Sequence, residues 1–73
     1  MRLPTIKPRQ LVKALKKAGF QEARQTGSHL ILVNRASRKI IPVPIHNKDI
    51  KRGLLVSIIK QAQLTIEEFI DLL

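Results

Sequence analysis

The chain has 73 residues, with 14 Lys and Arg against 5 Asp and Glu for a formal net charge of +9, and it has no cysteine. This length predicts a single domain over residues 1–73. The missing cysteine excludes disulfides, thiolate metal sites and a cysteine nucleophile. The first residues lack the apolar segment of a signal peptide, and the apolar runs are far shorter than a membrane span, so we expect a cytoplasmic protein without membrane contact.

The excess of positive charge is spread along the whole chain and indicates which class of molecule the protein binds. A basic domain attracts polyanions at long range, which makes nucleic acid the expected partner. A solvated basic surface kept for solubility is the alternative. Because Phe20 and Phe69 are the only aromatic residues, the chain has no platform on which single-stranded bases stack. We therefore expect recognition through phosphates and nucleic-acid shape.

A first helix is predicted after a flexible lead over residues 1–6. Pro8 suits the first turn of a helix, because its missing N–H has no partner there. Gly19 suits the position just past the end. The apolar residues between them share one helical stripe: Leu11, Val12, Leu15 and Ala18. The helix should bury this stripe and present a basic face to solvent.

Three strands joined by short turns are predicted next. Residues 20–25 alternate weakly, whereas 29–33 and 39–43 carry branched aliphatic side chains, and turn residues separate the three segments. Pro42 indicates an edge position or the end of a strand. Short connections between successive strands are typical of an antiparallel meander.

The middle strand is apolar on both faces. One face holds Leu30 and Leu32, and the other holds His29, Ile31 and Val33. One of these faces must meet the helices. The other is either buried as well or a docking surface for a partner.

Two further helices complete the predicted fold. Lys48 or Asp49 is expected at the start of the first of them. Gly53 in its first turns lowers the stability of this helix, and close approach of a ligand or partner would explain a glycine there. Thr65 with Glu68 forms the capping-box pattern of a short last helix. The order helix, three strands, helix and short helix predicts an α+β fold, with helices on one face of a three-stranded antiparallel sheet.

His29 is the main candidate for catalysis. Gly27 can take positive φ, so the turn of Gly27 and Ser28 can present the imidazole at the edge of the sheet. An imidazole can take or give a proton near neutral pH. A packing role at the start of a strand is the alternative.

His46 is a possible second proton carrier, and a loop-ordering hydrogen bond just ahead of a helix is the alternative role for it.

The sequence has no metal-ligand cluster, no paired acids and no glycine-rich phosphate loop, so we expect neither a metal nor a cofactor. RNA cleavage without a metal needs a proton removed from the 2′-hydroxyl, a proton given to the leaving oxygen, and cations on the phosphate. His29 with Lys or Arg side chains suffices for this in outline.

Two groups of cations are candidates for RNA binding. Lys48, Lys51 and Arg52 are predicted at or near a helix N-terminus, where backbone N–H groups add to the attraction for phosphate. Lys13 and Lys16 on the first helix form the second candidate surface. For both groups the alternative is a solvated face.

Several segments together resemble the HicA toxins of HicA–HicB toxin–antitoxin systems, over nearly the whole chain from Leu11 to Leu73. These segments are Gly27-Ser28-His29, Val43-Pro44-Ile45-His46, Lys51-Arg52-Gly53-Leu54-Leu55, Ile58-Ile59-Lys60-Gln61-Ala62 and Glu68-Phe69. The resemblance implies a fold like the double-stranded RNA-binding domain, an mRNA interferase activity that arrests translation, and neutralisation by a HicB antitoxin. The catalytic histidine of the family carries over onto His29, and no second catalytic residue carries over. The sequence departs from many relatives where Gln63-Leu64 replaces the common Gly-Leu after the second helix.

Two other classes of protein stay open on the sequence alone. One is a non-enzymatic RNA- or DNA-binding module of the same fold, including a toxin homologue without activity. The other is a purely structural interaction protein. For a toxin, we expect an acidic HicB-like partner to dock over the second apolar face of the sheet, cover His29 and screen the positive surface in one contact.

Overall fold

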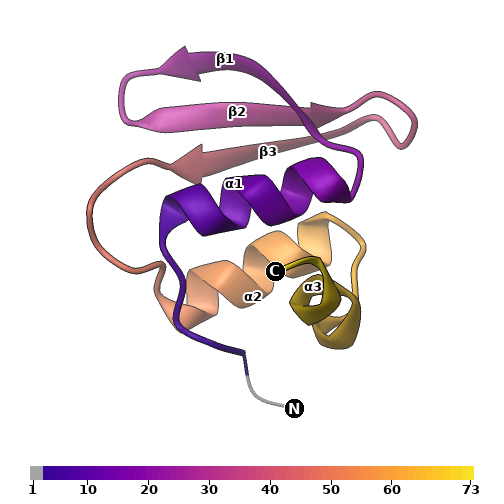
Figure 1. Ribbon diagram of the computed structural model, residues 1–73. Helices are drawn as coiled ribbons and strands as arrows, with labels where there is room; N and C mark the ends of the chain where they lie inside the picture. Colours follow the sequence, from indigo (N-terminus) through magenta and orange to yellow (C-terminus); the bar gives the residue numbers. More distant parts are fainter. Residues whose placement is uncertain (1–2) are drawn as a thin grey trace.

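The computed structural model describes residues 3–73 as three helices and one sheet (Figure 1). The chain runs through α1 (Pro8–Lys17), β1 (Gln21–Thr26), β2 (His29–Asn34), β3 (Lys39–Pro44), α2 (Arg52–Gln61) and α3 (Ile66–Leu72). The sheet is antiparallel in the order β1-β2-β3, and all three helices lie on one side of it (Figure 1). The predicted α+β arrangement, like that of double-stranded RNA-binding domains, is confirmed.

The hydrophobic core lies between the helices and the sheet. α1 contributes Leu11 and Leu15, and α3 contributes Phe69, all without solvent exposure. The other fully buried large side chains come from the sheet and α2: Leu32, Ile41, Val43, Leu55, Ile58 and Ile59. No polar side chain is buried among residues 3–73, so apolar burial is the main source of stability.

The end of α1 confirms the predicted role of Gly19. This residue has φ +105°, and its N–H donates to the carbonyl of Lys16 at 3.1 Å while the N–H of Phe20 donates to that of Leu15 at 3.0 Å. These two hydrogen bonds define a Schellman motif, which needs a left-handed residue where glycine has no steric penalty.

The end of α2 repeats this motif with a different residue. Gln63 has φ +61°, its N–H donates to the carbonyl of Lys60 at 2.9 Å, and the N–H of Leu64 donates to that of Ile59 at 3.1 Å. A residue with a Cβ is disfavoured in this conformation. Gln63, unlike Gly19 at the end of α1, is therefore a strained residue at its helix end.

The start of α3 follows the predicted capping box. The hydroxyl of Thr65 accepts from the N–H of Glu68 at 3.0 Å, and the carboxylate of Glu68 accepts from the N–H of Thr65 at 2.8 Å. Two N–H groups that the helix leaves unpaired are thereby satisfied.

The start of α2 differs from the prediction, because the helix begins at Arg52 rather than at Lys48 or Asp49. The N–H of Ile50 instead donates to the carbonyl of Ile6 at 2.8 Å, and both side chains are buried. This contact holds the segment ahead of α2 against the lead segment. Of the predicted flexible lead over residues 1–6, Met1 and Arg2 lie outside the described residues, whereas Ile6 is part of the core.

The register of the sheet decides which apolar face of β2 is covered. Leu30 and Leu32 pair with Val43 and Ile41, and this set faces the helices, since Leu32 and its β3 partners are buried. His29, Ile31 and Val33 pair with Pro44, Pro42 and Ile40 on the other side. We call these six residues the open face, because the helices all lie on the opposite side of the sheet (Figure 1).

Both edges of the sheet are irregular. The N–H of Ile45, just past β3, donates to the carbonyl of Ser28 at 2.6 Å. Because successive N–H groups alternate sides along a strand, the ring nitrogens of Pro42 and Pro44 face the free edge of β3, where they have no hydrogen to donate. At the other edge, the pairing of β1 shifts register between Glu22 and Arg24, and all six residues of β1 are exposed.

None of the helices formed by residues 3–73 is both long enough and apolar enough to cross a membrane.

Candidate active site and nucleic-acid interface

Four segments lie toward one end of the molecule, on the left in Figure 1. They are the β1–β2 turn, the loop between β3 and α2, and the N-terminal ends of α1 and α2 (Figure 1). This end therefore gathers both histidines with the predicted cations around α2.

The β1–β2 turn presents His29 in the predicted manner. Thr26 pairs with His29 across a turn of only Gly27 and Ser28, and Gly27 has φ +56°. Positive φ at the first central residue alone is the pattern of a type II′ turn, which suits the twist of a hairpin. The imidazole of His29 is exposed and belongs to the open face, so a polymeric substrate can reach it.

Ser28 links this turn to the segment that carries His46. Its carbonyl accepts the short hydrogen bond from the N–H of Ile45, and His46 is the next residue in the chain. The two histidines thus lie on directly adjoining backbone segments.

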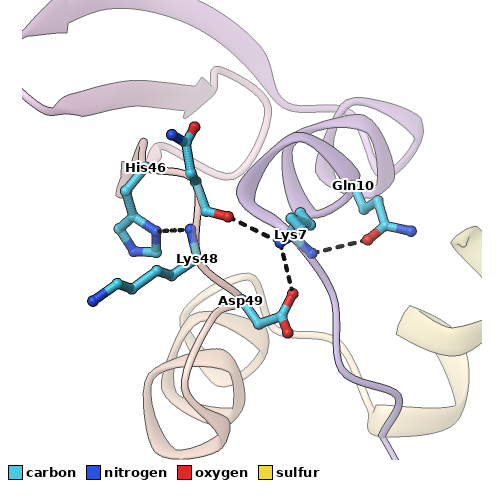
Figure 2. A network of polar contacts seen from close by, with 6 residues as sticks. Lys7, Gln10, His46, Lys48 and Asp49 are labelled. Carbon is cyan, nitrogen blue, oxygen red and sulfur yellow. Dashed lines mark hydrogen bonds and ion pairs between the residues drawn. The ribbon is translucent and has the colours of Figure 1, made fainter.

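The loop around His46 is held in place by a network of polar contacts (Figure 2). The N–H of Lys48 donates to Nδ1 of His46 at 3.1 Å. An accepting Nδ1 carries no proton, so the neutral ring has its proton on Nε2. This contact is of the loop-ordering kind that was one of the two roles considered for His46.

Lys7 fixes the same loop to the start of α1 (Figure 2). Its Nζ donates to the carbonyl of Asn47 at 2.9 Å and forms an ion pair with Asp49 at 3.5 Å. Its own N–H donates to the side chain of Gln10 at 2.9 Å. Sequence reasoning missed Lys7, because the residues that it joins lie about 40 positions apart and no local pattern connects them.

The predicted cations around α2 lie at the exposed start of that helix. Lys51 is the N-cap residue, Arg52 is the first helical residue, and Lys48 lies in the preceding loop. All three are exposed. Gly53 has no neighbour within 4 Å of an added Cβ and no positive φ, so neither crowding nor backbone conformation within residues 3–73 requires glycine there.

The cations of α1 line a groove on the helix side of the sheet, which we call the α1 groove. Its wall carries Arg9, Lys13 and Lys16, and Lys16 forms an ion pair with Glu22 of β1. Sequence reasoning missed Arg9, although its spacing of four from Lys13 places the two on one helical face. The structure thus divides the predicted RNA-binding residues into the α1 groove and the start of α2, with the His46 loop between them.

The α1 groove and His29 lie on opposite sides of the sheet. Leu30 lines the groove, and the alternation along β2 turns its neighbour His29 to the open face. The open face with His29 and the cations of the α1 groove are therefore two separate surfaces.

These groups have the chemistry for acid–base catalysis on a phosphodiester. An exposed imidazole can exchange a proton, and the Lys and Arg side chains of the α1 groove and the start of α2 can bind phosphates. Within residues 3–73, no three His, Asp or Glu side chains come together as metal ligands.

Residues 8–64 of the 73-residue chain match the model of the HicA toxins of bacterial toxin–antitoxin systems. The matched region runs from the first residue of α1 to just past the end of α2, so it includes both histidines. No curated protein sequence matches the chain.

Proposed function

The chain belongs to the HicA toxin family of bacterial toxin–antitoxin systems, and we propose that it is an endoribonuclease that cleaves mRNA without a metal and so arrests translation in the cytoplasm. The observation that carries this proposal is the exposed His29, which follows a turn whose Ser28 is hydrogen-bonded to Ile45, the residue before His46.

In the proposed reaction, the RNA supplies its own nucleophile. A base removes the proton from a 2′-hydroxyl, the 2′-oxygen forms a bond to phosphorus, and the bond to the 5′-oxygen breaks as an acid protonates that oxygen. The products are a 2′,3′-cyclic phosphate and a 5′-hydroxyl end. His29 acts as the acid or the base, and Lys or Arg side chains stabilise the charge that develops on the phosphate oxygens.

His46 is the candidate for the second proton carrier. The hydrogen bond that Nδ1 accepts from the N–H of Lys48 orients the neutral ring with its proton on Nε2. For Nε2 to accept a proton from RNA or give one to it, Nδ1 must itself carry a proton. Catalysis by His46 therefore requires this hydrogen bond to break, so the catalytic and loop-ordering roles exclude each other at any one moment.

Neutralisation is proposed to occur on the open face, by an acidic antitoxin of the HicB type. Half-buried Ile31 and Val33 and exposed Ile40 offer an apolar surface. Arg24, which pairs with Ile31, and Arg38 at the β2–β3 turn provide positive charge at its rim. Acidic side chains facing these cations would give electrostatic complementarity, and His29 would be buried in the complex.

Expression in a bacterial host tests the activity. The wild-type chain should arrest growth and degrade mRNA, whereas His29→Ala and His29→Gln should do neither, with a loss in the cleavage rate of about 10²- to 10⁴-fold. Purified wild-type protein should cleave RNA in the presence of a metal chelator, and circular dichroism should show that both variants fold.

Equal growth of all three strains with intact mRNA would contradict the proposal. Salt-dependent RNA binding without cleavage would then favour the non-enzymatic RNA- or DNA-binding module, and no RNA binding at all would favour a structural interaction protein.

The cations at the start of α2 are tested by salt dependence. Replacing Lys48, Lys51 and Arg52 together with Gln should weaken RNA binding and lower the slope of log K against log salt by up to about three phosphate contacts. An unchanged slope would assign phosphate binding to the α1 groove instead. The measurement is fluorescence anisotropy of labelled RNA over a salt series.

A further inference from the structure

The α1 groove forms because α1 packs on β3 rather than on β1. The helix-facing side of β1 is therefore uncovered, and a groove of about 710 Å³ lies between β1 and the helix. This volume falls in the range of about 300–1,000 Å³ that is typical of small-ligand sites.

The floor and the wall of the groove differ in chemistry. Val12, Leu30 and Ile45 line it with apolar atoms, and all three are buried or half-buried. The wall carries Arg9 and Lys13, while the positive charge of Lys16 is balanced by Glu22. Arg9 and Lys13 form no ion pair within residues 3–73. An apolar floor beside these two cations suits a flat, apolar ring that is attached to a phosphate.

Polar residues that line the groove can read the edge of such a ring. They include Gln25, His46 and Asn47. Within the described part of the chain, the amide of Gln25 makes one contact, at 3.5 Å to the carbonyl of Gly27, which is at the limit of a hydrogen bond. It is therefore available to donate and accept with a base at the same time.

The groove and the proposed catalytic histidine lie on opposite sides of the sheet but at the same β1–β2 turn. Gln25 immediately precedes Thr26, and Leu30 immediately follows His29, so only the short β1–β2 turn separates the groove from the imidazole. RNA that passes over this turn would place one nucleotide in the groove and the adjoining phosphodiester at His29.

We propose that the α1 groove binds one unpaired nucleotide of the RNA, with its base on Val12, Leu30 and Ile45 and its phosphate on Arg9 and Lys13, and that Gln25 selects the base. The inference rests on the proposed ribonuclease function and deepens it, because the base held in the groove determines which phosphodiester is cleaved.

Binding measurements test the groove without relying on catalysis. His29→Ala protein is titrated with short labelled RNAs that differ at one unpaired position. We expect one base to be preferred, and the additional change Gln25→Ala to reduce that preference about tenfold, as for loss of one amide-to-base pair. Gln21→Ala is the matched control, since it is an exposed glutamine of the same strand that pairs with Val33 of the open face.

The cations are tested with the same RNAs. Arg9→Ala with Lys13→Ala should weaken binding of every RNA about equally, because phosphate contacts carry no base information. Lys17→Ala, on the same helix but outside the groove, should leave binding unchanged.

Cleavage mapping completes the test. With active protein, sequencing of the 5′-hydroxyl ends should show the preferred base at a fixed position next to the cut, and Gln25→Ala should relax that preference whereas Gln21→Ala should not.

The inference is wrong if the base preference in binding is absent or survives Gln25→Ala. It is also wrong if the groove variants lose antitoxin binding while RNA binding stays unchanged, since the groove would then be a protein-docking site. Failure of the wild-type chain to cleave RNA would overturn the proposed function alone, and the binding preference would still decide the inference.

Discussion

The two faces of the sheet carry similar apolar side chains but have different environments. Leu32, on the helix side of β2, has no solvent exposure, whereas Ile40, on the open face, is 65% exposed. Apolar character alone therefore does not distinguish a core residue from a surface residue in this chain. The difference comes from which face the helices cover, and the uncovered face is the one that contains His29.

The largest expected effect tests the covered face. Leu32→Ala should lower the free energy of unfolding by about 2–5 kcal/mol, because it leaves a cavity in the centre of a small core. Ile31→Ala, the neighbouring residue on the open face, should cost about 1 kcal/mol or less. Urea unfolding of both variants measures the contrast, and equal losses would show that the two faces are not energetically distinct.

An intermediate effect is expected for the open face in antitoxin binding. For the proposed acidic antitoxin on the open face, Ile40→Glu should weaken binding about tenfold or more, since it places a negative charge opposite negative charges. Leu73→Glu is the control, because Leu73 is an exposed apolar residue at the end of the chain, outside the open face. Isothermal titration calorimetry would measure both affinities. If Ile40→Glu binds like the wild type, the antitoxin docks elsewhere.

The smallest expected effect is on stability at the helix ends, which lie away from the open face. Gln63→Gly should raise the free energy of unfolding by about 1 kcal/mol, because glycine accepts the left-handed conformation at the end of α2 without a steric penalty. Gly19→Ala makes the reciprocal change at the end of α1 and should destabilise the chain. Both variants should keep wild-type antitoxin affinity, since neither residue lies on the open face. A destabilised Gln63→Gly protein would show that the side chain of Gln63 makes a compensating contact.

Much of the fold was predictable because its signals are local. Gly19 as the residue after α1, and Thr65 with Glu68 at the start of α3, act through hydrogen bonds within one helical turn. The Gly27-Ser28 turn that presents His29 is similarly local. Each of these features depends on neighbours that the sequence places side by side.

The remaining features were not predictable because they depend on tertiary contacts. Asp49 has the chemistry of an N-cap residue, yet it pairs with Lys7, and α2 begins three residues later. Either face of β2 could have met the helices on its residue types alone. The α1 groove arises from the way α1 diverges from β1, a relation between elements that no single segment encodes.

The irregular edges of the sheet have a consequence for self-assembly. An exposed strand edge is a template for fibril-like stacking of identical chains, and a toxin that outlasts its antitoxin would accumulate with its sheet uncovered. Pro42 and Pro44 remove donors from one edge, and the shift between Glu22 and Arg24 breaks the regular spacing at the other. Because growth of the sheet is hindered at both edges, we expect the free chain to stay dispersed, with its apolar surface available to a partner that approaches the open face.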